Sequence, residues 1–238
     1  MIQTKKIILT LSCVLAGVFI LTNWYYSGED SIWFYLDKNT FFFFNQLIEN
    51  NLIFRYIVAI TNLRMFDAVG FLAMFLILFS YYLKADKQTR HFIICMGITI
   101  LLTAVLVKQF NNFINIHRAS PTLYFKEQGL PLVLVSELTG LPAKDTSGSC
   151  FPGDHGMCLI IFCLFMLRYM GSRAFILGLT VVVLFSLPRI MGGAHWLTDV
   201  LVGAVSCNLI VVSVVLLSPI SDRVISGFMK LFHWSMPA

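Results

Sequence analysis

Long apolar runs recur along this 238-residue chain, and they constrain its fold more than any other feature. A helix needs about 20 mostly apolar residues to cross the hydrocarbon core of a bilayer. Hydrophobic residues make up 58% of the chain and charged residues only 12%, whereas soluble domains carry roughly 25% charged residues. We therefore expect an all-α integral membrane protein. No linker, internal repeat or low-complexity tract divides the chain, so residues 1–238 are expected to form a single domain.

Six segments have the composition of membrane spans, although the fourth and fifth are short. They cover residues 7–26, 66–84, 92–110, 155–171, 173–188 and 195–217. The first follows Lys5 and Lys6 and ends in interfacial aromatic residues without a small-residue cleavage site, so it is expected to remain as an uncleaved span. Six spans predict a helix bundle with both termini on one side of the membrane.

Residues 27–65 alternate aromatic and aliphatic residues with polar ones, which suits an interfacial helical segment better than a further span. The alternative, a seventh span, breaks the charge asymmetry described below. The four phenylalanines at 41–44 are expected to lie among lipid chains, and contact with a lipid substrate is the alternative.

The basic residues indicate the orientation of the bundle. The side that holds both termini carries nine Lys and Arg against two acids, while the other side carries eight against ten. Short cytoplasmic loops are enriched in Lys and Arg, so both termini are expected in the cytoplasm. The net charge of +5 then reflects topology, and we expect the lipid bilayer, and no nucleic acid, as a partner.

Six cysteines are present, but only Cys150 lies in the outer loops. A single exposed cysteine there cannot form an intrachain disulfide, and no CxxC pair or spaced carboxylate cluster indicates a metal site. We expect no metal and no other cofactor.

Three polar clusters fall where the apolar spans meet the outer side of the membrane. They are residues 108–121, 149–156 and 188–199. Charged side chains at membrane depth are costly, so they tend to mark function. Three distant segments that meet at one depth predict a site between the bundle helices.

In the third cluster, His195 and Asp199 are four residues apart, so on a helix the carboxylate can orient the imidazole as a nucleophile. Arg189 can fold back across Gly192 and Gly193 and offer a planar fork of donors to a phosphate. The alternative interpretation is that His195 only anchors the span at the interface while Asp199 caps it.

In the second cluster, Pro152 and Gly153 suit a turn, Asp154 is a good N-cap residue, and His155 stands in the first turn of the next helix. The free N–H groups of such a helix start suit an anion, and the histidine can give a proton to a leaving oxygen. The alternative is a capped helix with an interfacial histidine.

The first cluster supplies Arg118, with Lys108 further back as a weaker candidate for binding phosphate. Taken singly, basic residues that flank a span are usually membrane anchors. Together, the three clusters predict a phosphate site that includes a nucleophile and an acid.

The order of these residues resembles the three-part motif of the type 2 phosphatidic acid phosphatase superfamily: Lys with Arg-Pro, Pro-Ser-Gly-His, and Ser-Arg with a later His and Asp. Arg189, His195 and Asp199 match the third part in spacing. The other parts depart from it. Pro121 does not directly follow Arg118, Asn111 occupies the lysine position, PGDH replaces Pro-Ser-Gly-His, and Pro188 stands where the family often has Ser.

With these departures, the stretches RASPTL, VSEL, FPGDHGM and PRIMGGAHW resemble one branch of that superfamily, the lipid A 1-diphosphate synthases of Gram-negative bacteria. The similarity extends to FFFFNQL and to TNLRMFD near residues 61–67. Enzymes of this branch are phosphotransferases that move a phosphate from undecaprenyl diphosphate to lipid A, a lipopolysaccharide modification. The resemblance therefore implies these two lipids as partners, the bacterial inner membrane as location, and an active site that faces the periplasm.

The resemblance also implies residue roles. His195 attacks the terminal phosphorus and forms a phosphohistidine, Asp199 orients it, and His155 protonates the leaving undecaprenyl phosphate. Arg118 and Arg189, with Gly153 and Lys108, bind phosphoryl oxygens without a metal. Asp154 is expected as a cap, or alternatively as a residue that favours a lipid phosphate acceptor over water.

Two other functions stay open at this point. A lipid phosphate phosphatase shares the first half-reaction, and motifs do not separate it from a transferase. A transporter fits less well, because transporters place paired charges near mid-bilayer whereas these charges gather near one face.

Overall fold

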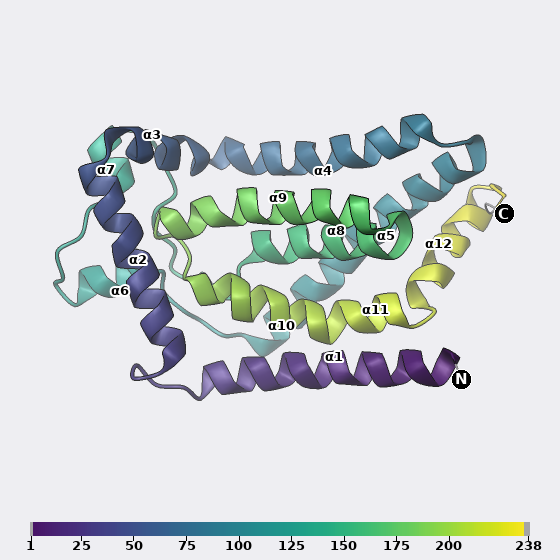
Figure 1. Ribbon diagram of the computed structural model, residues 1–238, viewed down its shortest axis with the longest axis horizontal. Helices are drawn as coiled ribbons and strands as arrows, with labels where there is room; N and C mark the ends of the chain where they lie inside the picture. Colours follow the sequence, from purple (N-terminus) through teal and green to yellow (C-terminus); the bar gives the residue numbers. More distant parts are fainter. Residues whose placement is uncertain (1, 236–238) are drawn as a thin grey trace.

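The computed structural model describes residues 2–235, and within that range it contains helices and no strand. Six helical stretches run side by side along the long axis (Figure 1). They are α1 (Ile2–Tyr25), α4 (Arg64–Lys84), α5 (Lys87–Ile114), α8 (Asp154–Met170), α9 (Ser172–Met191) and the stretch Asp199–Leu217. This confirms the expectation of an all-α bundle, with bounds that shift by a few residues from those predicted.

Five of these stretches are long and apolar enough to cross a membrane, counted over the part of the chain that is described. The remaining one, α8, has 17 residues. Large apolar side chains on α1 and α4, such as Leu15, Phe19 and Phe71, are more than half exposed. Such a surface is stable against lipid chains and not against water, so the bundle is that of a membrane protein.

The helix that follows the last polar cluster is irregular. It begins with the π-helical turn η1 (Asp199–Ala204) and continues through α10 (Val205–Cys207), the second π-helical turn η2 (Asn208–Val212) and α11 (Ser213–Leu217). Turns of this kind are frequent at functional sites. The first of them begins at Asp199, one of the predicted site residues.

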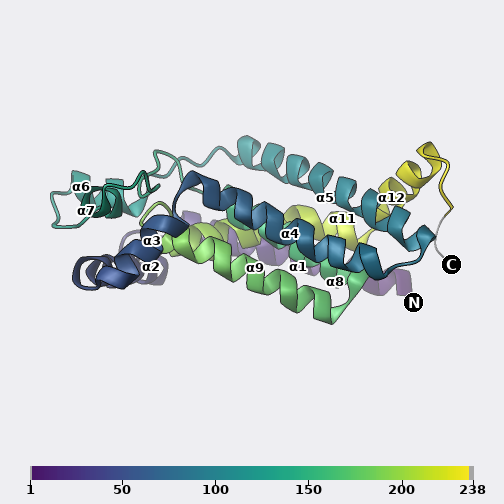
Figure 2. The same ribbon diagram turned by 90° about the horizontal axis from the view of Figure 1, so that it is seen from above.

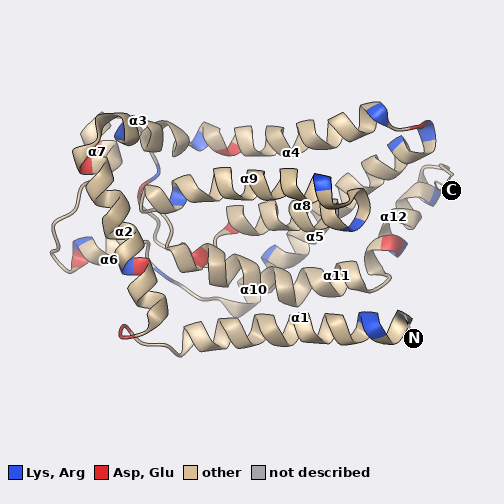
Figure 3. Ribbon diagram, in the orientation of Figure 1, with Lys and Arg blue, Asp and Glu red and all other residues tan. Residues whose placement is uncertain are grey.

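The core of the bundle lies between α5, α8 and the last span, where residues such as Met96, Phe165 and Cys207 are fully buried. Gly178 of α9 lets that helix approach α8 closely, because a Cβ there would lie 3.1 Å from the Cα of Cys163. The amphipathic helix α12 (Ile220–Leu231) packs on α5 at the end that holds both termini. In Figure 3, Lys and Arg occur at both ends of the bundle, and this end carries few Asp and Glu beside them.

Residues 27–65 form two helices, α2 (Ile32–Asn50) and α3 (Leu52–Thr61), which are separated at Asn51. The side chain of Asn51 accepts the N–H of Phe54 and caps α3. In Figure 1, α2 lies across the end of the bundle, and Figure 2 shows the short helices α6 (Pro121–Glu127) and α7 (Val135–Thr139) beside it. These four helices cover the end where the polar clusters meet.

The prediction that the phenylalanines at 41–44 face lipid is wrong for Phe41 and Phe42. Phe41 is buried, and both rings pack against Phe125 of α6 with centroids 5.2 and 4.8 Å away. Only Phe43 is mostly exposed. The period-3.6 pattern of α2 directs Asp37, Phe41, Asn45 and Ile48 to one buried face.

Candidate active site

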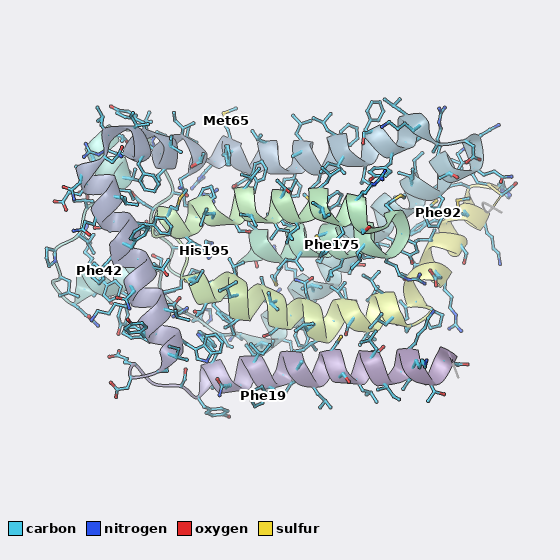
Figure 4. The ribbon with its side chains drawn as sticks, in the orientation of Figure 1. Phe19, Phe42, Met65, Phe92, Phe175 and His195 are labelled. Atoms are coloured by element: carbon cyan, nitrogen blue, oxygen red, sulfur yellow. The ribbon has the colours of Figure 1, made fainter. Side chains whose placement is uncertain are left out.

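The three polar clusters meet between the cap formed by α2, α3, α6 and α7 and the ends of α8 and α9. In Figure 4, His195 lies at this end of the bundle, in the turn between α9 and the last span. The structure brings Arg118, His155, Arg189 and Asp199 to the same region, through the contacts described below.

His195 is held by the backbone of a tight turn. Gly193 adopts a positive φ of 77°, and the N–H groups of Ala194 and His195 both donate to the carbonyl of Arg189 at 3.1 Å. A side chain at Gly193 would also collide with Thr122. His195 therefore precedes the helix, which corrects the expectation that it shares a helical face with Asp199.

The expected histidine–carboxylate contact is nevertheless present. His195 Nδ1 lies 3.2 Å from Asp199 Oδ2, which also accepts the N–H of Trp196 at 2.9 Å. Both residues are buried, and the His195 residue is 9% exposed. Because the carboxylate occupies Nδ1, that nitrogen carries the proton and Nε2 is the nitrogen with a free lone pair.

Arg118 joins Asp199 to a second buried carboxylate. Its Nη1 donates to Asp199 Oδ1 and to Thr198 Oγ1, both at 2.9 Å, and its Nη2 donates to Asp37 Oδ2 at 2.7 Å. The indole rings of Trp24 and Trp196 lie 5.1 and 4.4 Å from the guanidinium carbon. These bonds use three of the five N–H groups of an arginine, so two remain for a ligand.

Asp37 is 1% exposed, and its carboxylate accepts three hydrogen bonds, including the one from Arg118. Oδ1 accepts the N–H of Thr198 at 2.9 Å, and Oδ2 accepts the hydroxyl of Thr198 at 2.6 Å as well as Arg118. Burial raises the pKa of Asp37 above its ordinary value, and the charge of Arg118 and the bonds from Thr198 oppose that rise.

Arg189 is the counterpart of Arg118 on the other side of the site. Its Nη2 forms an ion pair with Asp67 of α4, and its Nη1 donates to the backbone carbonyl of Asn62 at 3.2 Å. The same Asp67 oxygen lies 3.1 Å from His155 Nε2. The N–H of Lys144 donates to the same Asn62 carbonyl at 2.9 Å.

The start of α8 differs from the expectation in two details. The N-cap position is Gly153, which adopts φ 80°, and no side chain caps the helix, so Asp154 is its first residue and not its cap. The N–H of Gly153 donates to the carbonyl of Cys150 at 3.0 Å, and it is therefore not free to bind phosphate. A Cβ at Gly153 would lie 3.3 Å from the Asp199 carbonyl, so glycine permits close packing of the two segments.

A cavity of about 380 Å³ opens between α4, α5, α8 and α9 beside His155. His155, Asp67, Asp154 and Lys108 form its polar lining, so Lys108 faces the same cavity as His155. The rest of the lining is apolar and comprises Gly70, Phe71, Met74, Leu101, Ala104, Val105, Val107, Met157, Cys158, Leu159, Ile161 and Phe185. A cavity of this composition fits a lipid chain that ends in a polar head.

Cys150 is buried, contrary to the expectation of an exposed thiol. Burial, followed by the nearby Asp199 carboxylate, raises the pKa of Cys150, so the thiol stays protonated. Its sulfur lies within 4.8 Å of ligand atoms of His195 and Asp199, a grouping that the sequence spacing did not reveal. Arg118 bonds to Asp199 and disfavours a cation there, and the absence of a metal stays a prediction.

Comparison with known proteins identifies the family. The family model described as the PAP2 superfamily matches residues 91–222. The chain belongs to the PAP2 superfamily. The match begins in α5 and includes every motif residue discussed above, which confirms the resemblance seen in the sequence. Among curated proteins, the lipid A 1-diphosphate synthase of Escherichia coli (strain K12) is 42% identical over 217 residues, which are 91% of this chain and 90% of that protein. No solved structure matches.

Sequence reasoning missed four residues that hold the PAP2 motif side chains in place: Asp37, Asn62, Asp67 and Thr198. Three of these precede the PAP2 match. Asp37 could have been found from its spacing, because it shares one face of α2 with Phe41, Asn45 and Ile48. For Asn62 and Asp67 the sequence offers two signals: each is a polar residue near the start of an apolar span, and both lie in the stretch TNLRMFD that resembles the family branch.

Proposed function

We propose that this chain is a lipid A 1-diphosphate synthase, which transfers the terminal phosphate of undecaprenyl diphosphate to the 1-phosphate of lipid A. The observation that carries the proposal is the His195 contact with Asp199, which leaves Nε2 as the nucleophilic nitrogen in a site with two arginines and a second histidine. The lipid A 1-diphosphate synthase that is 42% identical supports the choice of substrates.

In the first half-reaction, His195 Nε2 attacks the terminal phosphorus of the donor. The bond from nitrogen to phosphorus forms as the bridging P–O bond breaks, and undecaprenyl phosphate leaves. His155 gives the leaving oxygen a proton from the ring nitrogen that does not face Asp67. Arg118 and Arg189 bind the equatorial oxygens with their remaining N–H groups and stabilise the charge of the transition state.

In the second half-reaction, an oxygen of the lipid A 1-phosphate attacks the phosphohistidine. His155 takes up the proton of that phosphate, the bond from phosphorus to Nε2 breaks, and lipid A 1-diphosphate leaves. Asp199 keeps the His195 ring oriented through both steps. Lys108, on the cavity wall, and Lys144, whose N–H binds the same Asn62 carbonyl as Arg189, supply positive charge for the two phosphate groups.

The part of the undecaprenyl chain next to the diphosphate lies in the apolar cavity between α4, α5, α8 and α9. An isoprenoid chain gains about 0.8 kcal/mol for each CH₂-sized group that leaves water, so an apolar lining contributes affinity without specific bonds. The polar end of the cavity then holds the diphosphate beside His155.

The segment 119–148 covers the site and favours a lipid phosphate over water as the acceptor. Its two ends are joined by the bond from the N–H of Ser120 to the Ser147 carbonyl at 2.9 Å, and the hydroxyl of Thr122 ties it to the Gly193 carbonyl at 3.0 Å. Asp154 lines the same cavity as His155, where it is placed to favour a lipid phosphate acceptor over water.

We further propose that α8 completes a bundle of six membrane spans, and that α2 and α3 lie in the membrane interface. Both termini then lie in the cytoplasm and the active site faces the periplasm of a bacterial inner membrane. The basic residues at the end that holds α12 and the acidic residues near α2, α6 and α7 support this orientation (Figure 3).

The test uses purified protein in detergent and undecaprenyl diphosphate labelled in its terminal phosphate, with lipid A present or absent. We expect label on lipid A and little free phosphate in either sample. Free phosphate released at the same rate in both samples would mean a lipid phosphate phosphatase and would overturn the proposed transfer.

A further inference from the structure

Asp37 stands out because the PAP2 match does not include it. It comes from α2, it is 1% exposed, and its carboxylate makes bonds to Arg118 and to both the N–H and the hydroxyl of Thr198. Thr198 immediately precedes Asp199, and Arg118 bonds directly to Asp199. Asp37 is therefore linked to Asp199 in two ways: through Arg118, which bonds to both carboxylates, and through Thr198, the residue before Asp199.

A buried ion pair contributes little net stability, because desolvation of the charges offsets their attraction. Another reason for a buried acid at this position lies in the charge balance around Asp199. Arg118 carries one positive charge and contacts two carboxylates, Asp37 at 2.7 Å and Asp199 at 2.9 Å. Because Arg118 shares its charge between two carboxylates, it neutralises Asp199 only in part, and Asp199 can still attract the Nδ1 proton of His195.

If Asp37 were neutral, the whole charge of Arg118 would act on Asp199. The carboxylate would then attract the Nδ1 proton of His195 less strongly, and Nε2 would be a weaker nucleophile. The Thr198 hydroxyl, which bridges Asp37 and Arg118, would also lose its anionic partner. Both changes act on the nucleophile and neither removes a contact to substrate.

We propose that Asp37 is a positioning residue for the nucleophile: through Arg118 and Thr198 it fixes the orientation and the charge of Asp199, and thereby the reactivity of His195. This inference rests on the proposed function, because it requires His195 to be the residue that is phosphorylated. It assigns to α2 a part in the reaction, beyond covering the end of the bundle.

The experiment measures the rate of phosphohistidine formation in a single turnover, with the labelled donor, no acceptor and full-length protein in detergent. Asp37→Asn keeps the shape and one of the two acceptor oxygens that Thr198 uses, and it removes the charge. We expect the rate per folded molecule to fall about tenfold or more, the size of effect that corresponds to one pKa unit in the nucleophile. The KM for the donor should stay unchanged or fall, since the uncompensated Arg118 attracts phosphate.

Glu49→Gln is the matched control, because Glu49 is an exposed acid on the same helix. It should form phosphohistidine at the wild-type rate. A purely structural role for Asp37 would reduce the amount of folded protein and leave the rate per folded molecule unchanged, and that result would overturn the inference.

Thr198→Val provides a second test, which decides the question if Asp37→Asn does not fold. It removes the bridging hydroxyl while the backbone bond from Thr198 to Asp37 remains. A slower phosphohistidine step at unchanged KM supports the inference, and a wild-type rate overturns it. If the wild-type protein forms no phosphohistidine at all, the proposed function itself fails.

Discussion

The two histidines of the site stand in contrasting surroundings. His195 is buried and its Nδ1 faces Asp199, which Arg118 and Asp37 hold in turn; we call these four residues the nucleophile group. His155 is partly exposed beside the apolar cavity and faces Asp67, which is paired with Arg189; we call these three the proton group.

Each group contains one arginine of the PAP2 motifs and one carboxylate from the chain before residue 91. The difference between the groups fits the roles that we propose for them. A nucleophile must keep one orientation and be shielded from water, whereas an acid–base residue must meet the leaving group and the acceptor in turn. The burial of the nucleophile group and the cavity beside the proton group match these requirements.

Replacement of the proposed nucleophile, His195, is expected to lower turnover more than any other substitution. His195→Gln removes the attacking nitrogen, and we expect turnover to fall at least about 10³-fold for every donor. Steady-state assays with undecaprenyl diphosphate and with a p-nitrophenyl phosphate ester measure it. Residual activity within tenfold of wild type would mean that another residue is phosphorylated.

His155→Ala should lower turnover about 10²- to 10³-fold with undecaprenyl diphosphate, because general acid catalysis is lost. With a p-nitrophenyl ester, whose leaving group needs no proton, the loss should be much smaller. Equal losses with both donors would contradict the division between the two groups.

Asp67→Asn sharpens the comparison with Asp37→Asn. Removing the Asp67 charge releases Arg189 and leaves His155 without its partner, so we expect turnover to fall about tenfold, one pKa unit in the acid. The p-nitrophenyl donor should restore activity in this variant and not in Asp37→Asn. If both variants respond to the leaving group in the same way, the two carboxylates serve one common group.

The apolar cavity lies beside His155 and Asp67 of the proton group. A substitution that fills it tests whether the cavity holds the lipid chain of the donor. Ala104→Phe should raise the KM for undecaprenyl diphosphate about tenfold, because contact with about two CH₂ groups is lost. The KM for a short, soluble donor should not change. Leu106→Phe, on the same helix but outside the cavity lining, is the control.

The smallest effect concerns stability and pH. The pKa of Asp37 is raised in the folded protein, so its ionised form costs folding free energy above that pKa, and this cost disappears as pH falls toward the unfolded value of 3.8. Asp37→Asn has no such dependence. Thermal melting in detergent should therefore show the wild type gaining stability relative to Asp37→Asn as the pH is lowered through that range. A relative loss would mean that Arg118 outweighs burial.

The sequence predicted the spans and the motif residues because both depend on local patterns. A long apolar run predicts a membrane-spanning helix, and Arg189, His195 and Asp199 lie within eleven consecutive residues of the chain. It did not predict the partners of Arg118 and Arg189, since Asp37 and Asp67 are 81 and 122 residues away from them along the chain. The burial of Phe41 and Cys150 was not predicted for the same reason, because it depends on how α2 and the outer segments fold over the bundle.

The central claim is that the buried histidine is the one that carries the phosphate. The most direct measurement is a rapid acid-free quench after mixing with labelled undecaprenyl diphosphate, followed by peptide mapping of the labelled protein. The account predicts acid-labile label on the peptide that contains His195, in wild type and, formed more slowly, in His155→Ala. Label on the His155 peptide, or persistent label in His195→Gln, would contradict it.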